Sequence, residues 1–200
     1  KHGITNTYLS GQRHLPDTVG GNTYTHDANG NLKSRVGPDV PGGTQTIQYT
    51  PFDLPKQVVT GTGTTRTTQC DYTADGTRVV RRDATTTQHF ASSLYQRVLS
   101  TSGGSTLEEH FRLFAGAGAV AEVVRKPGSE TTLYLHPDHL GTPDTISDGS
   151  GNVTHQEYGP FGDLVGVPPS INGNSTRVGF TGHQQDNDIG FTDMGGREFD

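Results

Sequence analysis

The densest group of potentially reactive side chains in this sequence is the run His136-Pro137-Asp138-His139. Imidazole and carboxylate groups at such close spacing are typical ligands of Zn²⁺. Pro137 favours a turn at this point, however, and nothing in the sequence specifies the rest of a ligand set. We therefore expect Asp138 and His139 to hydrogen-bond the backbone of a turn and its neighbouring strands. We predict neither a metal site nor a cofactor.

Other reactive residue types are present without the pattern that their chemistry needs. The chain has 9 His and many Ser, but no serine stands in the glycine pattern of a nucleophile elbow, so a Ser–His–Asp triad is not expected. Cys70 is the one cysteine, which excludes an internal disulfide and a cysteine-built zinc site. We expect Cys70 to be a small packed side chain. Asn152 and Asn174 begin glycosylation acceptor patterns, which matter only on a eukaryotic secretory route.

The composition indicates a β-rich chain with many turns. Of the 200 residues only 28% are hydrophobic, while 28 are Gly and 11 are Pro. Disorder would explain so low an apolar fraction, but the chain favours the strand formers Thr, Val, Tyr and Phe over Glu, Lys and Ser. The net charge of -6 argues against nucleic-acid binding across the whole chain. We also find no run of about 18 apolar residues that would predict a membrane span, and no signal-peptide pattern.

The elements that must position these side chains read as short strands separated by tight turns. The clearest hairpin covers residues 23–32, where Asn29-Gly30 suits a type I′ turn with positive φ at both central residues. After it, apolar or small side chains alternate with Lys33 and Arg35, which predicts a strand with one wetter face.

The middle of the chain continues in the same way. Residues 106–114 suit a buried strand better than a helix, because Gly116 and Gly118 follow at once. Residues 120–125 and 131–135 are short β-branched or aromatic runs closed by turn residues, which predicts two further consecutive strands.

A unit of about 23 residues repeats along the chain, long enough for two strands and two turns. A tyrosine marks each unit, spaced by 25, 23 and 23 residues in the first four, and residues 148–153 restate residues 27–32. One such hairpin cannot bury a face alone, so the units should pair into a continuous sheet. We expect the tyrosines to pack in a ladder on one face, with a sugar-binding aromatic stripe as the alternative; they are Tyr24, Tyr49, Tyr72, Tyr95 and Tyr158.

These motifs resemble those of a known family. Residues 24–32, with Tyr, Asp and Gly-Asn-Leu in order, resemble the tyrosine–aspartate (YD) repeat of rearrangement-hot-spot (Rhs) proteins. Residues 134–143, 148–152 and 158–162 resemble the Rhs-associated core, and Phe180-Thr-Gly-His with residues 195–200 matches its closing part. Gly159 and Thr142 depart from the core pattern, where the family has Asp and Ser.

The resemblance implies an all-β fold in which consecutive antiparallel β-hairpins form part of a β-cocoon, a spiral β-sheet shell, with the core segment as its C-terminal plug. It divides the chain into a lead-in segment at residues 1–19, YD-repeat hairpins at 20–130 and the Rhs-associated core at 131–200. Two hundred residues are too few to close such a shell, so we expect a segment or a shorter member of the family.

The resemblance also assigns a reactive site. In the family, a toxic domain downstream of the core is cut from the shell by an aspartyl protease activity of the shell itself. Asp200 corresponds to the first aspartate of the cleavage motif, with Arg197 before it, while toxin-complex relatives place the acid where this chain has Glu198. One carboxyl of such a pair keeps its proton as the acid while the other activates water. The second aspartate is not among these 200 residues, so this segment should not cleave itself, and an ordinary salt bridge near a strand end is the alternative role.

The leading functional hypothesis is therefore a structural one: a shell segment of a secreted bacterial Rhs-type toxin that encloses and delivers a C-terminal toxic domain. Its partners would be that domain in cis and a secretion or delivery machinery. The alternative is a YD-repeat adhesion, carbohydrate-binding or filament-forming protein at the cell surface, with glycans as partners. An enzyme in its own right is the weakest of the three.

Overall fold

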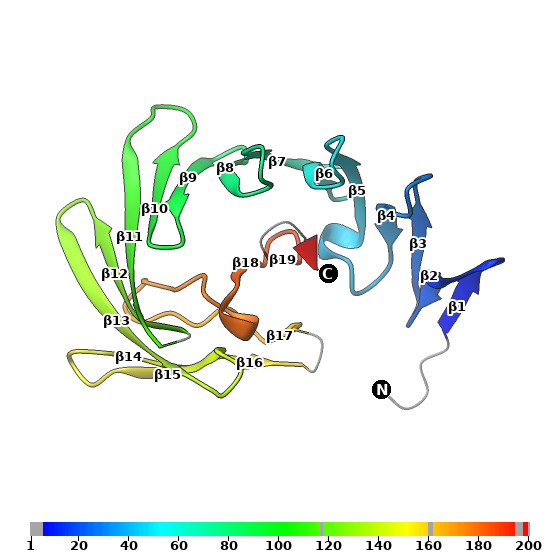
Figure 1. Ribbon diagram of the computed structural model, residues 1–200. Helices are drawn as coiled ribbons and strands as arrows, with labels where there is room; N and C mark the ends of the chain where they lie inside the picture. The colour runs from blue at the N-terminus through cyan, green and yellow to red at the C-terminus, as the bar shows by residue number, and fades with distance from the viewer. Residues whose placement is uncertain (1–5, 117, 160–161, 195–197, 200) are drawn as a thin grey trace. The chain divides into compact units, whose positions relative to one another are not determined.

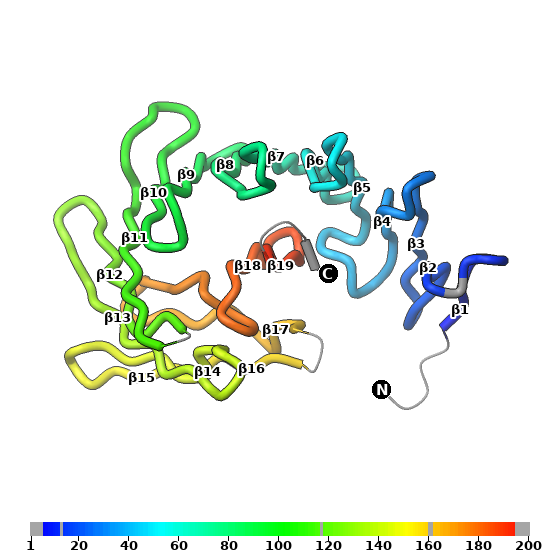
Figure 2. Tube along the Cα trace, viewed as in Figure 1, coloured from blue at the N-terminus to red at the C-terminus, as the bar shows by residue number. Residues whose placement is uncertain are grey.

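The computed structural model describes residues 6–116, 118–159, 162–194 and 198–199. In these residues all regular structure is β-strand apart from two 3-10 turns, η1 (Pro41–Gly43) and η2 (Phe180–Gly182). The prediction of an all-β fold built from consecutive antiparallel hairpins is confirmed (Figures 1 and 2). Within the described part of the chain, no helix is long and apolar enough to cross a membrane.

The chain divides into two compact units, residues 1–70 and 71–200. In the first unit each strand is hydrogen-bonded to the next one along the chain. Its strands are β1 (Asn6–Leu9), β2 (Gln12–Val19), β3 (Asn22–His26), β4 (Leu32–Val36), β5 (Thr44–Tyr49), β6 (Pro55–Thr60) and most of β7 (Arg66–Tyr72).

The second unit repeats this plan and then adds two small sheets. Its main strands, again paired in chain order, are β8 (Arg78–Arg82), β9 (Thr86–Ser92), β10 (Tyr95–Ser100), β11 (Thr106–Ala115), β12 (Gly118–Lys126), β13 (Ser129–Pro137), β14 (Pro143–Asp148) and β15 (Val153–His155). β16 (Glu157–Tyr158) pairs with β17 (Leu164–Val165), and β18 (Gln184–Asp186), β19 (Phe191–Asp193) and β20 (Glu198–Phe199) form a three-stranded sheet. The strands predicted at 106–114, 120–125 and 131–135 are confirmed, while the family-based boundary at residue 130 stays a prediction.

One five-residue turn, Asp-x-x-Gly followed by Asn or Thr, recurs in both units. In the first unit the Asp27 carboxylate accepts hydrogen bonds from the backbone N–H groups of Asn29 and Asn31, both at 2.9 Å. Asp148 makes the same pair of bonds at the turn before β15, and Asp138 makes it at the turn before β14, to Leu140 and Thr142. The carboxylate thus satisfies backbone donors that the turn leaves without a strand partner.

This turn corrects the predicted type I′ geometry. Gly30 has φ +88°, but Asn29 is not among the residues with positive φ. The N–H of Gly30 donates to the carbonyl of Asp27 at 3.1 Å, so the loop is one of five residues with a single left-handed position. Asparagine before glycine suggested two left-handed residues, but the Asp27 carboxylate favours the longer loop.

The same turn settles what Asp138 does. It is a turn residue, as expected, with its carboxylate on the backbone of its own loop, and His139 is the exposed second residue of that loop. His136 lies near the end of β13, before this turn, where its Nε2 is 2.9 Å from the Ser147 hydroxyl.

The predicted wetter face of β4 is wrong at Arg35, although Lys33 is exposed as expected. Arg35 is buried, and its Nε donates to Gln45 Oε1 at 2.7 Å, while Val36 is 48% exposed. Gln45 Nε2 in turn donates to the Thr60 hydroxyl at 3.1 Å. A row of hydrogen-bonded polar side chains therefore crosses β4, β5 and β6 on the buried face, where the alternation favoured an apolar one.

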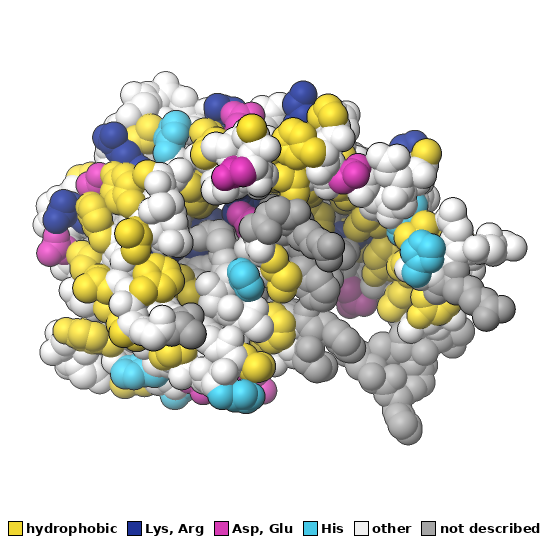
Figure 3. Space-filling view, in the orientation of Figure 1, with side chains coloured by type: hydrophobic (Ala, Val, Ile, Leu, Met, Phe, Trp, Pro, Cys, Tyr) yellow, Lys and Arg dark blue, Asp and Glu magenta, His cyan; other side chains and the backbone are white. Residues whose placement is uncertain are grey.

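The repeated tyrosines are half-buried. The Tyr49 hydroxyl donates to the carbonyl of Leu32 at 2.9 Å, and the Tyr95 hydroxyl donates to Glu109 at 2.6 Å. Burial raises the pKa of Tyr158 far above its ordinary value. These contacts support the packing role over a sugar-binding stripe. On the face shown in Figure 3, hydrophobic side chains form small patches between polar ones.

We predict that Asp138→Ala destabilises the second unit by about 1 kcal/mol, because two backbone N–H groups lose a charged acceptor. Asp138→Asn keeps an acceptor oxygen and should cost less than half of that. The measurement is urea unfolding, with exposed Asp144→Ala as the control. A gain of stability on adding Zn²⁺ that Asp138→Ala abolishes would contradict the turn role and favour a metal site.

Candidate functional site

The residues predicted for self-processing fall at the edge of the described chain. Arg197 and Asp200 lie outside the described residues. Glu198 begins β20, where its backbone is paired with Asp193 of β19, and its side chain lies outside the description. The proposed catalytic roles of these three residues therefore remain predictions.

The described residues do assemble another charged centre, where a late segment of the chain covers the main sheet of the second unit. We call residues 171–193 the inner segment. Ile171 and Val178 of this segment share one buried cluster with Val124, Leu133 and Ile146 of β12, β13 and β14. Each such side chain contributes about 1.5–3 kcal/mol when removed from water. The inner segment is thus anchored at one end by ordinary hydrophobic packing.

At its other end the inner segment inserts an acid among arginines. Asp186 in β18 has a fully buried side chain and forms ion pairs with Arg78 and Arg81, whose side chains are 2% and 1% exposed. The Arg81 Nε atom lies 3.4 Å from Asp186 Oδ1. Arg78 Nε also lies 3.0 Å from Asp193 Oδ2, and Arg81 pairs with the half-exposed Asp188. We call this group the arginine–aspartate centre.

The electrostatics of the centre favour the charged forms. Burial alone would raise the pKa of Asp186, but the positive charges of Arg78, Arg81 and Arg177 outweigh it and hold that pKa below its ordinary value of 3.8. A buried ion costs several kcal/mol in lost hydration unless it is paired. Arg78 and Arg81 therefore require the inner segment to be in place.

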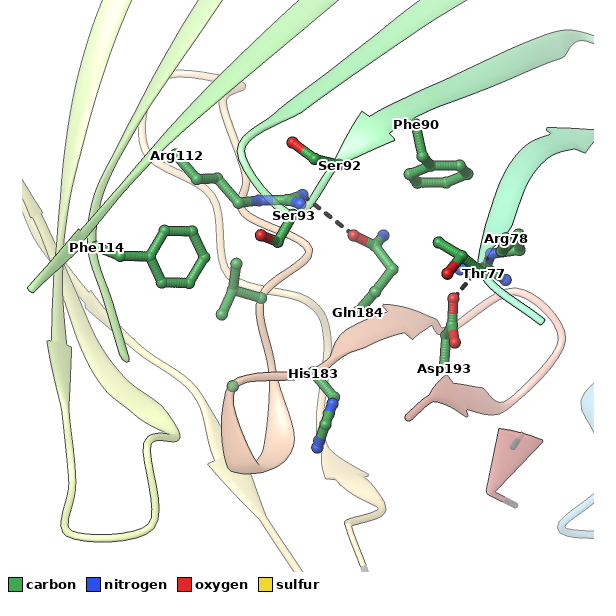
Figure 4. Close-up of a pocket in the computed structure, with 12 residues that line it drawn as sticks. Thr77, Arg78, Phe90, Ser92, Ser93, Arg112, Phe114, His183, Gln184 and Asp193 are labelled. Carbon is green, nitrogen blue, oxygen red and sulfur yellow. Dashed lines mark hydrogen bonds and ion pairs between the residues drawn. The ribbon is translucent and has the colours of Figure 1, made fainter. Parts of the chain in front are cut away.

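A pocket of about 210 Å³ lies beside the centre, between β8, β9, β11 and the inner segment. Arg112 donates to Gln184 Oε1 at 3.1 Å across it, and Phe90 and Phe114 provide apolar walls (Figure 4). Ser92 and Ser93 line the pocket too, but the His183 ring points away from both in Figure 4. The pocket thus offers hydrogen-bond donors and aromatic surface rather than a serine nucleophile with its base.

Sequence reasoning did not identify this centre. Residues 79–82 lie in β8, and nothing in a Val-Val-Arg-Arg run shows that Arg81 is buried. Asp186 stands inside the stretch that matches the closing part of the Rhs core, between His183 and Gly190. The available signal was an acid within a mostly uncharged stretch that contains several glycines. Its buried partners Arg78 and Arg81, however, are 108 and 105 positions away in the chain.

Comparison with known proteins gives structural neighbours only. No protein-family model matches the chain, and no curated protein matches it. The crystal structure of TcdB2-TccC3 without its hypervariable C-terminal region matches with a TM-score of 0.62 and 14% identity, over 88% of this chain and 11% of that one. The crystal structure of TcdB2-TccC3 matches with a TM-score of 0.61 and 15% identity, over 88% of this chain and 12% of that one.

A third neighbour is the Tc holotoxin pore of Photorhabdus luminescens, solved with a variant of TccC3, with a TM-score of 0.58 and 14% identity over 90% of this chain and 11% of that one. At these identities the likeness establishes the fold. The chain therefore has a fold found in Tc toxin complexes, and it spans about a ninth of the length of these neighbours.

We predict that Asp186→Asn destabilises the second unit by about 3 kcal/mol, because Arg78 and Arg81 would lose the one fully buried carboxylate that they share and keep only their more exposed partners. Asp188→Asn is the matched control: it removes a carboxylate from the same Arg81 at a side chain 43% exposed, and should cost less than about 1 kcal/mol. Both are measured by urea unfolding at pH 7.

Asp186 should also make the stability of the second unit depend on acid pH. Because the pKa of Asp186 is lowered, its stabilisation is present above pH 3.8, the unfolded value, and is lost as the pH falls through the lower folded value. Equal losses for the Asp186 and Asp188 variants would contradict the central role of Asp186.

Proposed function

We propose that this chain forms part of the wall of an Rhs-type toxin shell, which encloses a toxic domain and delivers it to a target cell. One observation carries the proposal: the hairpins pair in chain order into a sheet, and a later segment of the same chain is fixed onto one face of that sheet by buried ion pairs. A wall that carries its own inner segment suits enclosure better than turnover of a small substrate. The Rhs motifs and the fold likeness to TcdB2-TccC3 support it.

The proposal includes secretion and processing. The parent protein would be secreted, and its toxic domain would be released by a carboxylate pair to which Asp200 or Glu198 contributes, with Arg197 keeping one carboxyl ionised. The backbone of β20 supports this placement, since Glu198 is paired with Asp193, and Asp193 is an ion-pair partner of Arg78 in the arginine–aspartate centre. The strand that leads into the cleavage motif would thus be held against a rigid, buried part of the wall.

A second candidate function, binding of a cell-surface glycan, is favoured by the opposite face of the sheet. Neighbouring residues in a strand point to opposite faces, so Tyr95 and Phe111 lie away from the buried Gln96 and His110. Their rings are 5.0 Å apart, and the Arg125 guanidinium lies 5.1 Å from the centroid of the Phe111 ring. A half-buried aromatic pair with a cation beside it is a surface that a sugar ring could stack on.

The experiment that separates the two is protease protection of the natural parent protein. If the chain is shell wall, trypsin should leave the region downstream of residue 200 intact until the shell is unfolded by urea, because an enclosed chain is inaccessible. Rapid cleavage of that region in the native protein would contradict enclosure. Glycan binding that is lost in Tyr95→Ala would then favour adhesion.

A separate prediction concerns release of the fragment. Asn cannot ionise or take up a proton, so Asp200→Asn should slow self-cleavage of the parent protein by at least about 100-fold while the shell stays folded. Glu198→Gln tests the other candidate acid, Arg197→Ala tests the cation, and Asp144→Asn, at an exposed strand position, is the control. Gel analysis of the purified proteins gives the rates. Release by all three variants at the wild-type rate would show that these residues are structural.

A further inference from the structure

A second buried charged group lies on the same face of the sheet, outside the arginine–aspartate centre. His110 in the middle of β11 is 2% exposed. Its Nδ1 atom lies 3.0 Å from Glu122 Oε1 on β12, and its Nε2 atom lies 3.2 Å from Glu108 Oε2 on β11. Both ring nitrogens therefore face a carboxylate oxygen at hydrogen-bond distance.

With both carboxylates ionised, this geometry fits a doubly protonated ring. An ionised carboxylate only accepts hydrogen bonds, so each ring nitrogen must carry a hydrogen, and His110 is an imidazolium. In a neutral ring one nitrogen would instead present its lone pair to a carboxylate oxygen at about 3 Å, which is repulsive. The pair of contacts thus exists in one protonation state of His110.

The surrounding charges keep the carboxylates ionised. Arg112 Nε lies 3.2 Å from Glu122 Oε1, and Lys126 Nζ lies 3.1 Å from Glu108 Oε1. The hydrogen bond from His110 is the main cause that lowers the pKa of Glu108 to about 2. Burial would raise the pKa of Glu122, but His110 and Arg112 outweigh it. On the remaining packed elements, β10 presents the neutral Gln96 and the inner segment presents Thr176 and Gln184.

Two of these charged groups also hold the inner segment. Lys126 Nζ donates to the carbonyl of Gly173 at 2.7 Å, and Arg112 Nη2 donates to Gln184 Oε1 at 3.1 Å. Gly173 lies near the start of the inner segment, and Gln184 begins β18 in its second half. Glu108 orients Lys126, and Glu122 orients Arg112. His110 therefore lies between the two carboxylates that position the two hydrogen-bond donors to the inner segment.

We propose that His110 is a pH-sensitive latch, which in its imidazolium form holds residues 171–193 on the sheet and on losing its proton loosens them. The direction follows from its surroundings. Burial lowers the pKa of His110, but hydrogen bonds and charges from Glu108 and Glu122 outweigh it and raise that pKa above its ordinary 6.5. The stabilisation is complete below pH 6.5 and is lost as the pH rises through the folded value, so alkaline conditions open the latch. This property is independent of the proposed shell function.

The test on the wild-type chain is hydrogen exchange of residues 171–193 between pH 5.5 and 9, corrected for the intrinsic rate, with NMR titration of the His110 ring. We expect protection of the inner segment to fall about tenfold for each unit by which the pKa of His110 in the folded chain exceeds that in the unfolded chain. The midpoint of this fall should coincide with the midpoint of the His110 ring titration. The β13 amides serve as the internal reference. A His110 ring that loses its proton at or below pH 6.5, or inner-segment protection that does not change when the ring titrates, overturns the proposal.

The variant test is His110→Gln, which has no charge and cannot place an N–H toward two carboxylates on opposite sides. We expect its inner segment to exchange at every pH as the wild type does at high pH. His136→Gln is the matched control, since that ring is exposed and contacts only the Ser147 hydroxyl among the described side-chain bonds, and its pH profile should be that of the wild type. A pH-dependent loss of protection that persists in a folded His110→Gln overturns the proposal. If that variant does not fold, the wild-type titration decides.

Discussion

The second unit depends on one electrostatic constraint: guanidinium groups buried on one face of a sheet need a buried carboxylate as their partner. Arg78 and Arg81 of β8 are almost fully buried, and the Asp186 carboxylate that neutralises them comes from the inner segment. Replacing such a pair by apolar residues is often neutral, whereas removing one partner is costly. The ion pairs therefore determine where the inner segment lies on the sheet. The hydrophobic contacts of Ile171 and Val178 then stabilise this placement.

The covered face of the sheet is divided to match. From β8 to β12 a row of its buried positions is polar: Arg81 is paired in register with Gln88, Gln96 donates to Gln88 at 2.9 Å, and His110 and Glu122 continue the row. From β12 to β14 the buried positions are apolar, with Leu133 and Ile146 at the centre. The inner segment presents Asp186 and Gln184 to the first part and Ile171 and Val178 to the second. A protein with 28% hydrophobic residues thus builds its interior partly from satisfied polar side chains.

This division explains what the sequence predicted and what it did not. Hairpins and turns were predictable because their causes are local: a glycine with positive φ, an aspartate that accepts from its own loop, and alternating strands. Which face of each strand is buried was not predictable. Arginines such as Arg35 and Arg81 are usually exposed, and the local sequence pattern does not indicate their buried partners. The type I′ prediction failed for a related reason, since the Asp27 side chain competes with the preference of Asn29-Gly30. His110 and Asp186 needed knowledge of contacts between distant strands, which spacing in one sequence does not supply.

Pairing of each strand with its successor in the chain also bears on the order of folding. Each hairpin in a unit can form as soon as its own residues are available, since the loops that must close are short. The Arg78–Asp186 contact spans 108 residues, so it cannot form until the inner segment has been synthesised. During synthesis the β8 arginines would remain hydrated until the inner segment has been made. Closing this contact removes charged groups from water, whereas the hairpins before it close by backbone hydrogen bonds between neighbouring strands.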